Sequence, residues 1–579
     1  MSGDVKYEVN SKSISYLMTK VDAKELSIPE IQRPYVWENV QVRDLIDSLY
    51  KGYPIGYIII WSNDTVGLKD GSSSKNTSII IDGQQRITAL SAALKGREVF
   101  DNNYSKRRIK IAFNPITEKF EVLDSAIKRS DEWIEDISMF FVDGFDSFKF
   151  ALEYSKKTGY DASETSKVIS RLTSIPSMLV GLVELPSDLT LEEVTEIFNR
   201  INSKGVTLSQ ADFALSRIAA NLEYEGPNLR KSIDYFCHLI ARPQDYENII
   251  KSDEEFSKTE IFNNIKWIES YHSVFMPDYN DLLRIIFGYK FKRGRLRDFV
   301  QFLSGRNFET RTNEEEMVKK TFADLKTAIL ETTNQHNFKT YVNRLENIGL
   351  LKNKFIQSKN VINFGYILYL ILKEKGIDHD IRNICVERWL ILSNVTKRYS
   401  GSSETAFQRD IEMFVQSENP VEVIDRIEQA ELSDNFWDVT FIDQLSTSHT
   451  PTFYTFVMAQ IVSGDKAFLS TENITSIVKN VGDKHHVFPK KYLEENGFER
   501  TEYNQIANYV MINKETNIII GKKAPIDYLI EFDDEQKNYK ENALPTNLEN
   551  MEAKDYYEFL EERRKLMSKK IREYYERFK

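Results

Sequence analysis

Apolar and polar positions divide the chain into a first part with mixed strand and helix signals and a later part where helix signals dominate. Short apolar runs at 55–61 and 78–81 predict buried strands, and 109–113 with 120–123 predicts a hairpin. Apolar residues spaced three and four apart predict two helical faces: Val42, Leu45, Ile46 and Leu49, and Val194, Ile197, Phe198 and Ile201. We therefore expect residues 1–222 to form an α+β domain.

Two residue pairs in this domain predict helix starts. Thr190 with Glu193, and Ser209 with Asp212, have the spacing of a capping box, in which each side chain bonds the other residue's backbone N–H.

Strand signals fade beyond this domain. Long stretches such as 360–375 and 381–395 carry helical or wholly apolar patterns, so residues 223–445 are expected to be a helical middle domain. The polar segment 446–451, closed by a proline, predicts the boundary with a last domain, 446–579, which ends in a charged helix.

Composition narrows the class of protein. A chain of 579 residues exceeds what one hydrophobic core usually serves, which indicates two to four domains. The net charge of −11 excludes a globally basic surface for nucleic acid, so any DNA contact has to be local. The two cysteines lie far apart and favour a reducing compartment. Because the longest apolar run, 364–372, is nine residues and a membrane helix needs about 20, we expect a soluble, cytoplasmic protein without membrane association.

Two of the seven histidines are adjacent, within the segment 483–489. Downstream, 508–512 predicts a strand and 514–520 a short helix closed by Gly521. A strand, loop, strand and helix would let one histidine and one asparagine on the helix converge. Hydrolysis of a phosphodiester needs a base of near-neutral pKa and a divalent cation, and a histidine beside oxygen ligands can supply both.

A second polar motif joins the strand predicted at 78–81 to a helix predicted at 87–94. The motif is Asp82-Gly83-Gln84-Gln85-Arg86. Free N–H groups at a helix start attract phosphate, arginine adds a planar donor, and the glutamines can orient water or a ligand. Asp-Gly alone is also a turn signal. The sequence contains no GxxxxGK[ST] motif, which disfavours a P-loop ATPase.

Two further segments have the composition of a binding surface. Gln32 and Arg33 lie close to two aromatic residues, and Asn199 and Asn202 fall at the end of the capped helix. The structural alternative places the aromatic residues in the core and makes Asn202 and Gly205 a helix C-cap.

Taken together, these motifs resemble the GmrSD-type modification-dependent (Type IV) restriction endonucleases, over roughly residues 10–220 and 450–530. The resemblance implies an N-terminal domain similar to ParB and sulfiredoxin, in which the Asp-Gly-Gln-Gln-Arg motif is tied to nucleotide binding and hydrolysis. It also implies a C-terminal ββα-metal domain, that of the HNH or His-Me finger nucleases, embedded in helices.

The resemblance also implies roles for individual residues of the C-terminal domain. His486 would be the general base, and Asn508 would organise the loop. His485 and Asn517 would bind Mg²⁺ or Mn²⁺, with Asp483 as a second candidate ligand. His485 departs from the family, where this position is often acidic. Since imidazole is a softer ligand than carboxylate, Mn²⁺ is expected to support cleavage comparably well.

In the N-terminal domain, the expected ligand is a nucleoside triphosphate of unspecified base. Arg86 and Gln85 would contact phosphate and position water, and Asp82 would contact a metal or cap the helix. The rest of the pocket would be lined by Gln32, Arg33, Asn199 and Asn202.

Two basic segments are candidate DNA contacts. Lys292, Arg293 and Arg295 lie in a stretch with five basic residues in eight, and Lys490 and Lys491 follow the histidine pair. Lysine and arginine neutralise phosphates regardless of sequence, although most charge runs are only solvated surfaces.

The leading hypothesis is therefore an NTP-dependent endonuclease of antiphage defence that cleaves or nicks foreign, modified double-stranded DNA. One alternative is a defence nuclease with NTPase activity that senses phosphorothioate linkages. Another is a nucleotide-gated DNA-binding switch that does not cut. The sequence leaves open the DNA modification, the nucleotide base, the cut pattern, the sensing surface and whether the protein is a homo-oligomer.

Overall fold

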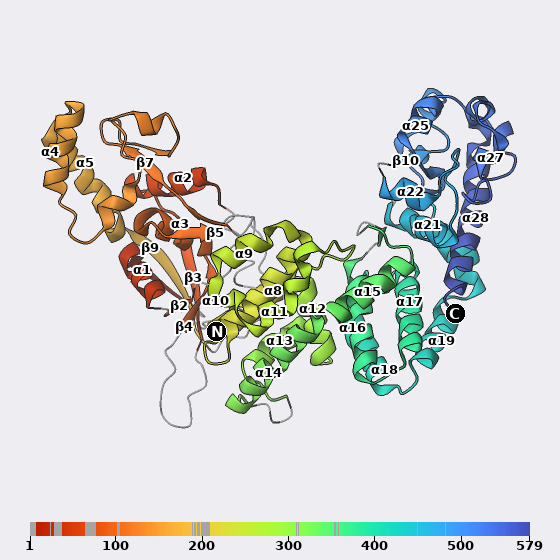
Figure 1. The fold of residues 1–579 in the computed structure, drawn as a ribbon, viewed down its shortest axis with the longest axis horizontal. Coiled ribbons are helices and arrows are strands. Elements are labelled where there is room, and N and C mark those ends of the chain that lie inside the picture. Colours follow the sequence, from red (N-terminus) through yellow and green to blue (C-terminus); the bar gives the residue numbers. More distant parts are fainter. Residues whose placement is uncertain are drawn as a thin grey trace, which may run out of the picture. The chain divides into compact units, whose positions relative to one another are not determined.

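A computed structural model describes most of the chain and divides it into two compact units. The described residues are 7–23, 25–27, 37–63, 77–100, 105–187, 189, 193, 197, 209–308, 310, 312–352, 355–356, 358–448, 450–480 and 482–579. One unit comprises Met1–Ser270 and Arg297–Ile329, and the other comprises Tyr271–Leu296 and Leu330–Lys579 (Figure 1). Each unit is built from two separate stretches of sequence. The division into domains 1–222, 223–445 and 446–579 stays a prediction.

A five-stranded sheet lies in the first unit. Its strands are β1 (Glu8–Ser13), β2 (Leu26–Ser27), β3 (Tyr57–Asn63), β4 (Thr77–Asp82) and β9 (Leu179–Leu185). They lie in the order β1, β9, β3, β4, β2. Strand β3 is parallel to β9 and antiparallel to β4. β3 and β4 confirm the strands predicted at 55–61 and 78–81.

Helices and a hairpin share one hydrophobic core with this sheet. The first three helices of the chain are α1 (Ile14–Asp22), α2 (Asn39–Tyr50) and α3 (Gln84–Lys95). The four apolar residues predicted to form one face of α2 are all buried in this core. Strands β7 (Ile111–Asn114) and β8 (Lys119–Val122) pair antiparallel, which confirms the predicted hairpin. The ring centroids of its Phe113 and Phe120 lie 4.6 Å apart, and both rings are buried in the core.

The rest of the first unit is largely helical. A short strand pair is formed by β5 (Glu98–Phe100) and β6 (Lys106–Arg108). The helices are α4 (Ser147–Thr158), α5 (Ala162–Thr173), α7 (Gln210–Ala220), α8 (Gly226–Ala241), α9 (Tyr246–Ser252), α10 (Glu254–Ser257), α11 (Glu260–Ile265), α13 (Leu296–Leu303) and α14 (Glu315–Thr332).

The capping box predicted for Ser209 and Asp212 is confirmed at the start of α7. Ser209 Oγ accepts a hydrogen bond from the Asp212 N–H at 3.2 Å, and Asp212 Oδ2 accepts from the Ser209 N–H at 2.9 Å. Thr190 and most of the helical face predicted at 194–201 lie outside the described residues.

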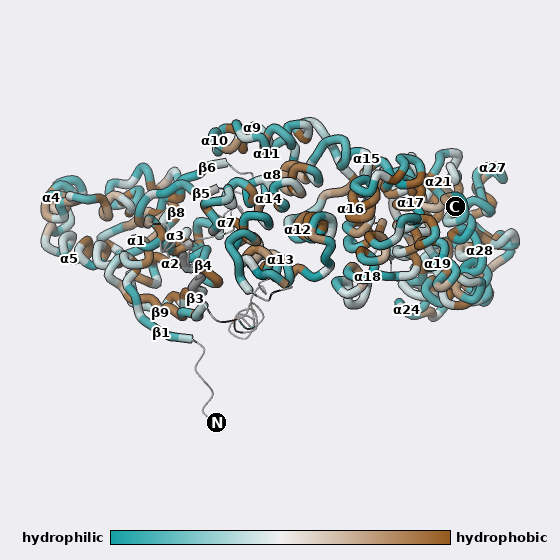
Figure 2. The backbone as a smooth tube through the Cα atoms, turned by 90° about the horizontal axis from the view of Figure 1, so that it is seen from below, coloured by the Kyte–Doolittle hydropathy of each residue, from teal (hydrophilic) through white to brown (hydrophobic). Residues whose placement is uncertain are grey.

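In the second unit, the described secondary-structure elements up to residue 445 are helices and helical turns. These are α12 (Tyr279–Lys290), α15 (Gln335–Asn347), α16 (Lys359–Glu374), α17 (His379–Val395), α18 (Ser403–Gln416), α19 (Pro420–Glu431), the π-helical turn η7 (Phe436–Thr440) and α20 (Phe441–Gln444). The apolar run 364–372 lies within α16 and is buried; hydrophobic residues are brown in Figure 2. Among the helices of the described part, none is both long and apolar enough to cross a membrane.

The last part of the second unit contains two short strands among helices. Its elements are α21 (Thr450–Ser463), α22 (Ile474–Lys479), β10 (Asp483–His486), α23 (Lys490–Glu495), α24 (Arg500–Tyr503), η8 (Ile506–Asn508), β11 (Tyr509–Ile512), α25 (Lys514–Ile520), α26 (Pro525–Tyr528), α27 (Asp534–Lys537) and α28 (Tyr556–Glu576). The strand and short helix predicted at 508–512 and 514–520 are confirmed as β11 and α25. The charged terminal helix is confirmed as α28. The ParB/sulfiredoxin-like and ββα-metal assignments stay predictions.

Candidate functional site

Two paired strands bring the histidine pair next to the segment that follows Asn508. β10 and β11 are antiparallel, with His485 opposite Val510 and His486 opposite Tyr509. The chain between them forms α23, α24 and η8, and α25 follows β11 directly. The order is strand, loop, strand and helix, as the motif spacing predicts.

The Asn508 side chain ties together the two ends of the intervening loop. Its Oδ1 accepts a hydrogen bond from the Phe488 N–H at 2.8 Å, and its Nδ2 donates to the carbonyls of Phe488 and Tyr503, both at 3.1 Å. The residue is 0% exposed. Because all three bonds engage backbone groups in a buried place, no other side chain of this size satisfies them. These contacts fit the loop-organising role that the resemblance implies.

The His486 ring lies close to two tyrosine rings and one asparagine. Its centroid is 5.1 Å from that of Tyr509 and 6.1 Å from that of Tyr503, with the ring planes steeply inclined in both pairs. Its Nε2 lies 3.0 Å from Oδ1 of Asn504. The ring is only partly buried, so one part of it remains accessible to solvent.

We expect His486 in the metal-free protein to titrate below about 6.5, the usual histidine value. Burial lowers its pKa, Lys484 and Lys490 lower it further, and the hydrogen bond to Asn504 opposes them in part. As the pH falls, the unfolded chain takes up this proton first. The folded state therefore loses stability below about pH 6.5 and is unaffected well above it.

The measurement is an NMR titration of ¹⁵N-histidine-labelled protein, with His486→Gln used to assign the signal. A midpoint at or above the usual histidine value would contradict the expected shift. A lowered pKa leaves the ring neutral at neutral pH and able to accept a proton.

The three predicted metal ligands differ in their surroundings. The ring centroids of His485 and His486 are 6.4 Å apart, with their planes at 81°. Asn517 is exposed on α25. Asp483 pairs through its backbone with Ile512, and its side chain lies outside the described ones. Among the described side chains, no three His, Cys, Asp or Glu residues form a metal-binding group. Imidazole nitrogen and amide oxygen both bind divalent first-row metals, so the donors of His485 and Asn517 fit such a cation.

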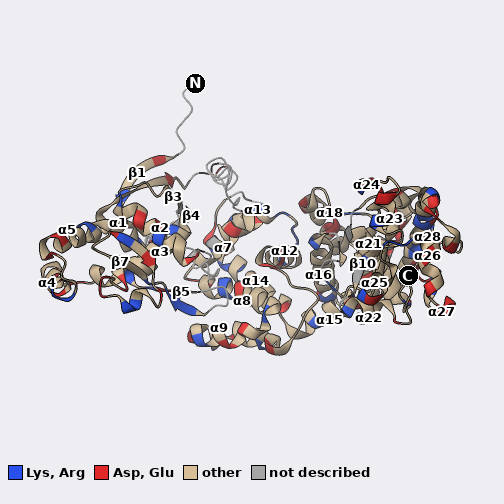
Figure 3. Ribbon diagram, turned by 90° about the horizontal axis from the view of Figure 1, so that it is seen from above, with Lys and Arg blue, Asp and Glu red and all other residues tan. Residues whose placement is uncertain are grey.

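Lys490 and Lys491 are exposed at the start of α23. Nζ of Lys490 lies 5.7 Å from the centroid of the Tyr503 ring and 3.6 Å from Oε1 of Glu494. Basic and acidic residues are intermixed along both units in Figure 3, so these lysines are a local feature of an acidic chain.

We expect the double substitution Lys490→Ala, Lys491→Ala to weaken binding to DNA of any sequence. If each lysine neutralises one phosphate, the slope of log K against log salt falls by about 2. Fluorescence anisotropy with a duplex at several salt concentrations measures this slope. The matched control is Lys156→Ala, Lys157→Ala, an adjacent exposed pair on α4. An unchanged slope in the Lys490/Lys491 variant, or an equal loss in the control, would contradict the assignment.

Two residues near His486 were missed by the sequence interpretation. Nζ of Lys484 lies 3.8 Å from the centroid of the Tyr509 ring. Since alternate strand residues share a face, the spacing of Lys484 and His486 could have indicated that they lie together. No comparable signal marks Asn504, which contacts His486 across 18 residues of sequence.

Helix α28 holds the backbone on both sides of Asn508. Arg563 is 0% exposed; its Nη1 donates to the Ala507 carbonyl at 2.6 Å and its Nη2 to the Tyr509 carbonyl at 2.7 Å. A longer contact of 3.4 Å joins Nη2 to the Asn542 carbonyl. The sequence gives no sign of these contacts, because they join residues that are more than 20 positions apart.

In the first unit, β4 passes into α3 through Gly83. Its φ of 96° lies in the left-handed region, and a Cβ added here would lie 2.3 Å from Cδ1 of Ile58. The Ile87 N–H donates to the Gly83 carbonyl at 3.0 Å and begins the helix. The glycine is therefore required by the turn.

Three other polar residues of this motif, Asp82, Gln84 and Arg86, already make hydrogen bonds in the folded chain. Nη2 of Arg86 lies 2.7 Å from Oδ2 of Asp82, and Nη1 donates to the Ile55 carbonyl at 3.0 Å. Nε2 of Gln84 donates to the Ile80 carbonyl at 2.9 Å. A nucleotide phosphate at this turn would therefore have to share Arg86 with Asp82.

Gln85 is the remaining described residue of the predicted nucleotide pocket. Within the described residues, Oε1 of Gln85 is buried without a hydrogen-bond partner. The four residues predicted to complete the pocket lie outside the described residues: Gln32, Arg33, Asn199 and Asn202.

We expect Gly56→Ala to destabilise the first unit more than Gly52→Ala. Both glycines have positive φ, 89° and 73°, so both substitutions introduce backbone strain of about 1–2 kcal/mol. A Cβ at Gly56 would lie 2.4 Å from Nη1 of Arg86, whereas none of the atoms lies within 4 Å at Gly52. Because the Arg86 guanidinium can move aside only by giving up its hydrogen bond to the Ile55 carbonyl, the additional loss for Gly56→Ala should be about 0.5–1.5 kcal/mol. Urea unfolding followed by circular dichroism measures both losses, and equal values would contradict the close approach.

The basic segment around Lys292 is partly buried, and Lys292 contacts other side chains of the second unit. Lys292 forms an ion pair with Glu374, and its Nζ lies 4.8 Å from the centroid of the Tyr289 ring. Burial lowers the pKa of Lys292, although Glu374 opposes this. Lys292, Arg293 and Arg295 are all partly buried. Lys292 is thus already paired, and DNA contact by these three residues stays a prediction.

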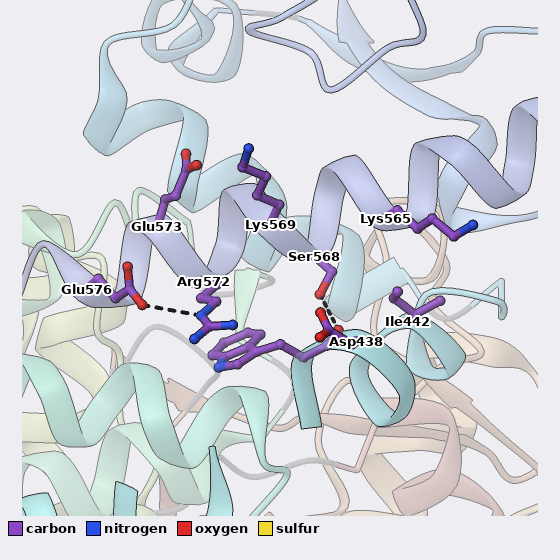
Figure 4. A pocket seen from close by; sticks show the side chains of 9 residues that line it. Asp438, Ile442, Lys565, Ser568, Lys569, Arg572, Glu573 and Glu576 are labelled. Carbon is purple, nitrogen blue, oxygen red and sulfur yellow. Dashed lines mark hydrogen bonds and ion pairs between the residues drawn. The ribbon is translucent and has the colours of Figure 1, made fainter. Parts of the chain in front are cut away.

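A pocket of about 710 Å³ lies between α28 and the η7–α20 segment of the second unit (Figure 4). Its charged lining consists of Lys565, Lys569, Arg572, Asp438, Glu573 and Glu576. The three basic and three acidic side chains balance, and Arg572 pairs with Asp434 at 2.7 Å. None of the site residues predicted from the sequence lines this pocket.

Two comparisons relate this chain to known proteins. Residues 14–219 match the family model of the GmrSD restriction endonuclease, N-terminal domain. The uncharacterized protein MJ0686 of Methanocaldococcus jannaschii is 21% identical over 583 residues, which cover 91% of this chain and 88% of the relative. The family match supports a restriction endonuclease role, with DNA as a partner. It includes the turn between β4 and α3 and ends before the histidine pair.

Proposed function

We propose that the chain is a metal-dependent endonuclease of antiphage defence that cuts foreign, modified DNA under the control of a nucleoside triphosphate. The match of residues 14–219 supports the restriction role. The observation that carries the nuclease assignment is the setting of His486. This partly buried histidine has a lowered pKa and stands where β10 meets a loop tied together by Asn508.

In the proposed reaction, His486 accepts a proton from the water that attacks phosphorus. The new P–O bond forms to this water oxygen, and the bond to the leaving oxygen of the DNA backbone breaks. Lys490 and Lys491 would bind neighbouring backbone phosphates and fix the duplex along α23.

His485 and Asn517 would hold a divalent cation, with Asp483 as the candidate additional ligand. When bound, the cation neutralises charge on the phosphate and the leaving oxygen. His485 also fits Mn²⁺, since imidazole is a softer donor than carboxylate.

The turn between β4 and α3 is the proposed nucleotide site. Arg86 would contact phosphate at the start of α3, and Gln85 would orient water. The ion pair between Asp82 and Arg86 would then weaken. Because Asp82 and a phosphate compete for one guanidinium, nucleotide binding would rearrange the turn. Such a rearrangement would change the contacts of the turn with the rest of the unit when nucleotide binds.

A matrix of DNA substrates tests this proposal. Unmodified, methylated, glucosylated and phosphorothioated duplexes are each incubated with and without NTP and with Mg²⁺ or Mn²⁺. Cleavage confined to a modified duplex with metal and NTP supports the proposed endonuclease. Binding without cutting under every condition would instead support a DNA-binding switch. Phosphorothioated DNA that stimulates NTP hydrolysis but is not itself cut would support the phosphorothioate sensor.

A further inference from the structure

Asn504 presents its side-chain oxygen to the proposed general base. It caps the C-terminal end of α24, where its backbone N–H donates to the Arg500 carbonyl at 3.2 Å. Its Oδ1 lies 3.0 Å from Nε2 of His486, and the Tyr509 hydroxyl makes a longer contact of 3.5 Å with the same oxygen. The helix end and these two side chains therefore hold the amide in one place.

This contact decides which nitrogen of His486 carries the proton. A neutral imidazole has one N–H donor and one lone pair, and the partner of either nitrogen selects between the two tautomers. An amide oxygen only accepts. Opposite the Asn504 oxygen, Nε2 of His486 must therefore be the N–H donor, and the lone pair falls on Nδ1.

We infer that Asn504 is a positioning residue that holds His486 in the Nε2–H tautomer, so that Nδ1 accepts the proton of the attacking water. The catalytic part of this inference rests on the proposed nuclease function. The tautomer itself is a property of the folded chain and can be measured without any reaction.

The first test is the tautomer. The chain has seven histidines, so ¹⁵N-histidine labelling of the full-length protein gives a tractable spectrum, and His486→Gln identifies the signal. At alkaline pH the wild-type signal should show protonated Nε2. Asn504→Asp keeps an oxygen acceptor and should retain this tautomer, whereas Asn504→Leu should give a mixture. Protonated Nδ1 in the wild type, or an unchanged tautomer in Asn504→Leu, would overturn the inference.

The second test is catalysis. Asn504→Leu should lower kcat for DNA cleavage by about 10- to 100-fold without changing KM, a smaller loss than the roughly 10²- to 10⁴-fold that the general base itself contributes. Asn504→Asp should recover most of this loss. The matched control is Asn496→Leu, because Asn496 is the exposed C-cap of the short helix α23 and its side chain donates to the Tyr492 carbonyl.

The outcomes separate the inference from the proposed function. If Asn504→Leu changes the tautomer but cleaves DNA at the wild-type rate, the positioning role is wrong and the nuclease assignment stands. If His486→Ala and the wild type cleave equally, the nuclease assignment is wrong, while the tautomer measurement remains valid.

Discussion

Replacing His486 by alanine should reduce metal-dependent DNA cleavage by about 10²- to 10⁴-fold, the range that a general acid or base contributes. The proton of the attacking water would then have no acceptor at this position. The lysines proposed to bind the DNA backbone remain, so the affinity for DNA should change little. Hydrolysis of nucleotide should also persist, because the proposed nucleotide site lies in the first unit.

The measurement is the rate of conversion of supercoiled to nicked and linear plasmid at saturating metal. His336→Ala is the matched histidine control, since His336 is exposed in the first turn of α15. Circular dichroism of both variants checks that the fold is retained. Undiminished cleavage by His486→Ala would rule out the proposed base.

Replacing Arg563 by methionine should destabilise the second unit by about 3–5 kcal/mol. The guanidinium donates to three buried carbonyls, and methionine fills similar volume without any donor. Each buried acceptor that loses its partner costs about 1–3 kcal/mol, and the longest of the three contacts should contribute least. This loss is a large fraction of the 5–15 kcal/mol that typically stabilises a domain.

Urea unfolding of the full chain, followed by tyrosine and tryptophan fluorescence, measures this effect. Lys565→Met is the control, because Lys565 is exposed two residues further along α28. Arg563→Lys should fall between the wild type and Arg563→Met, since one ammonium group cannot reproduce the planar fork. A loss below about 1 kcal/mol in Arg563→Met would contradict the proposed support of the loop.

Local patterns predicted much of the secondary structure. The apolar spacing of α2, the hairpin of β7 and β8, and the capping box of Ser209 and Asp212 all depend on residues within a few positions of one another. Their side chains contact through the geometry of a single helix or turn, so the sequence alone indicates them. Local patterns did not predict which stretches of the chain make up each compact unit, because each unit joins two stretches that are separate in sequence.

The candidate nuclease site was only partly predictable. The order of strand, loop, strand and helix follows from local patterns, and Lys484 could have been found from its spacing to His486. Lys292 illustrates the opposite case, because its basic neighbours suggested a free cation while Glu374, 82 residues away, pairs with it. Charge runs do not reveal such partners.

The sequence by itself determined which residues are candidates for chemistry: an adjacent histidine pair before a strand and helix, and a polar turn between a strand and a helix. The tertiary structure decided how these residues are held. It alone placed Asn504 on the His486 ring and Arg563 on the backbone beside Asn508. Both contacts join residues that are distant in sequence, whereas Asp82 and Arg86 pair at the local spacing of four residues. Only the packing of whole elements brings such groups within hydrogen-bonding distance. The local periodicity of the sequence does not indicate which elements pack together.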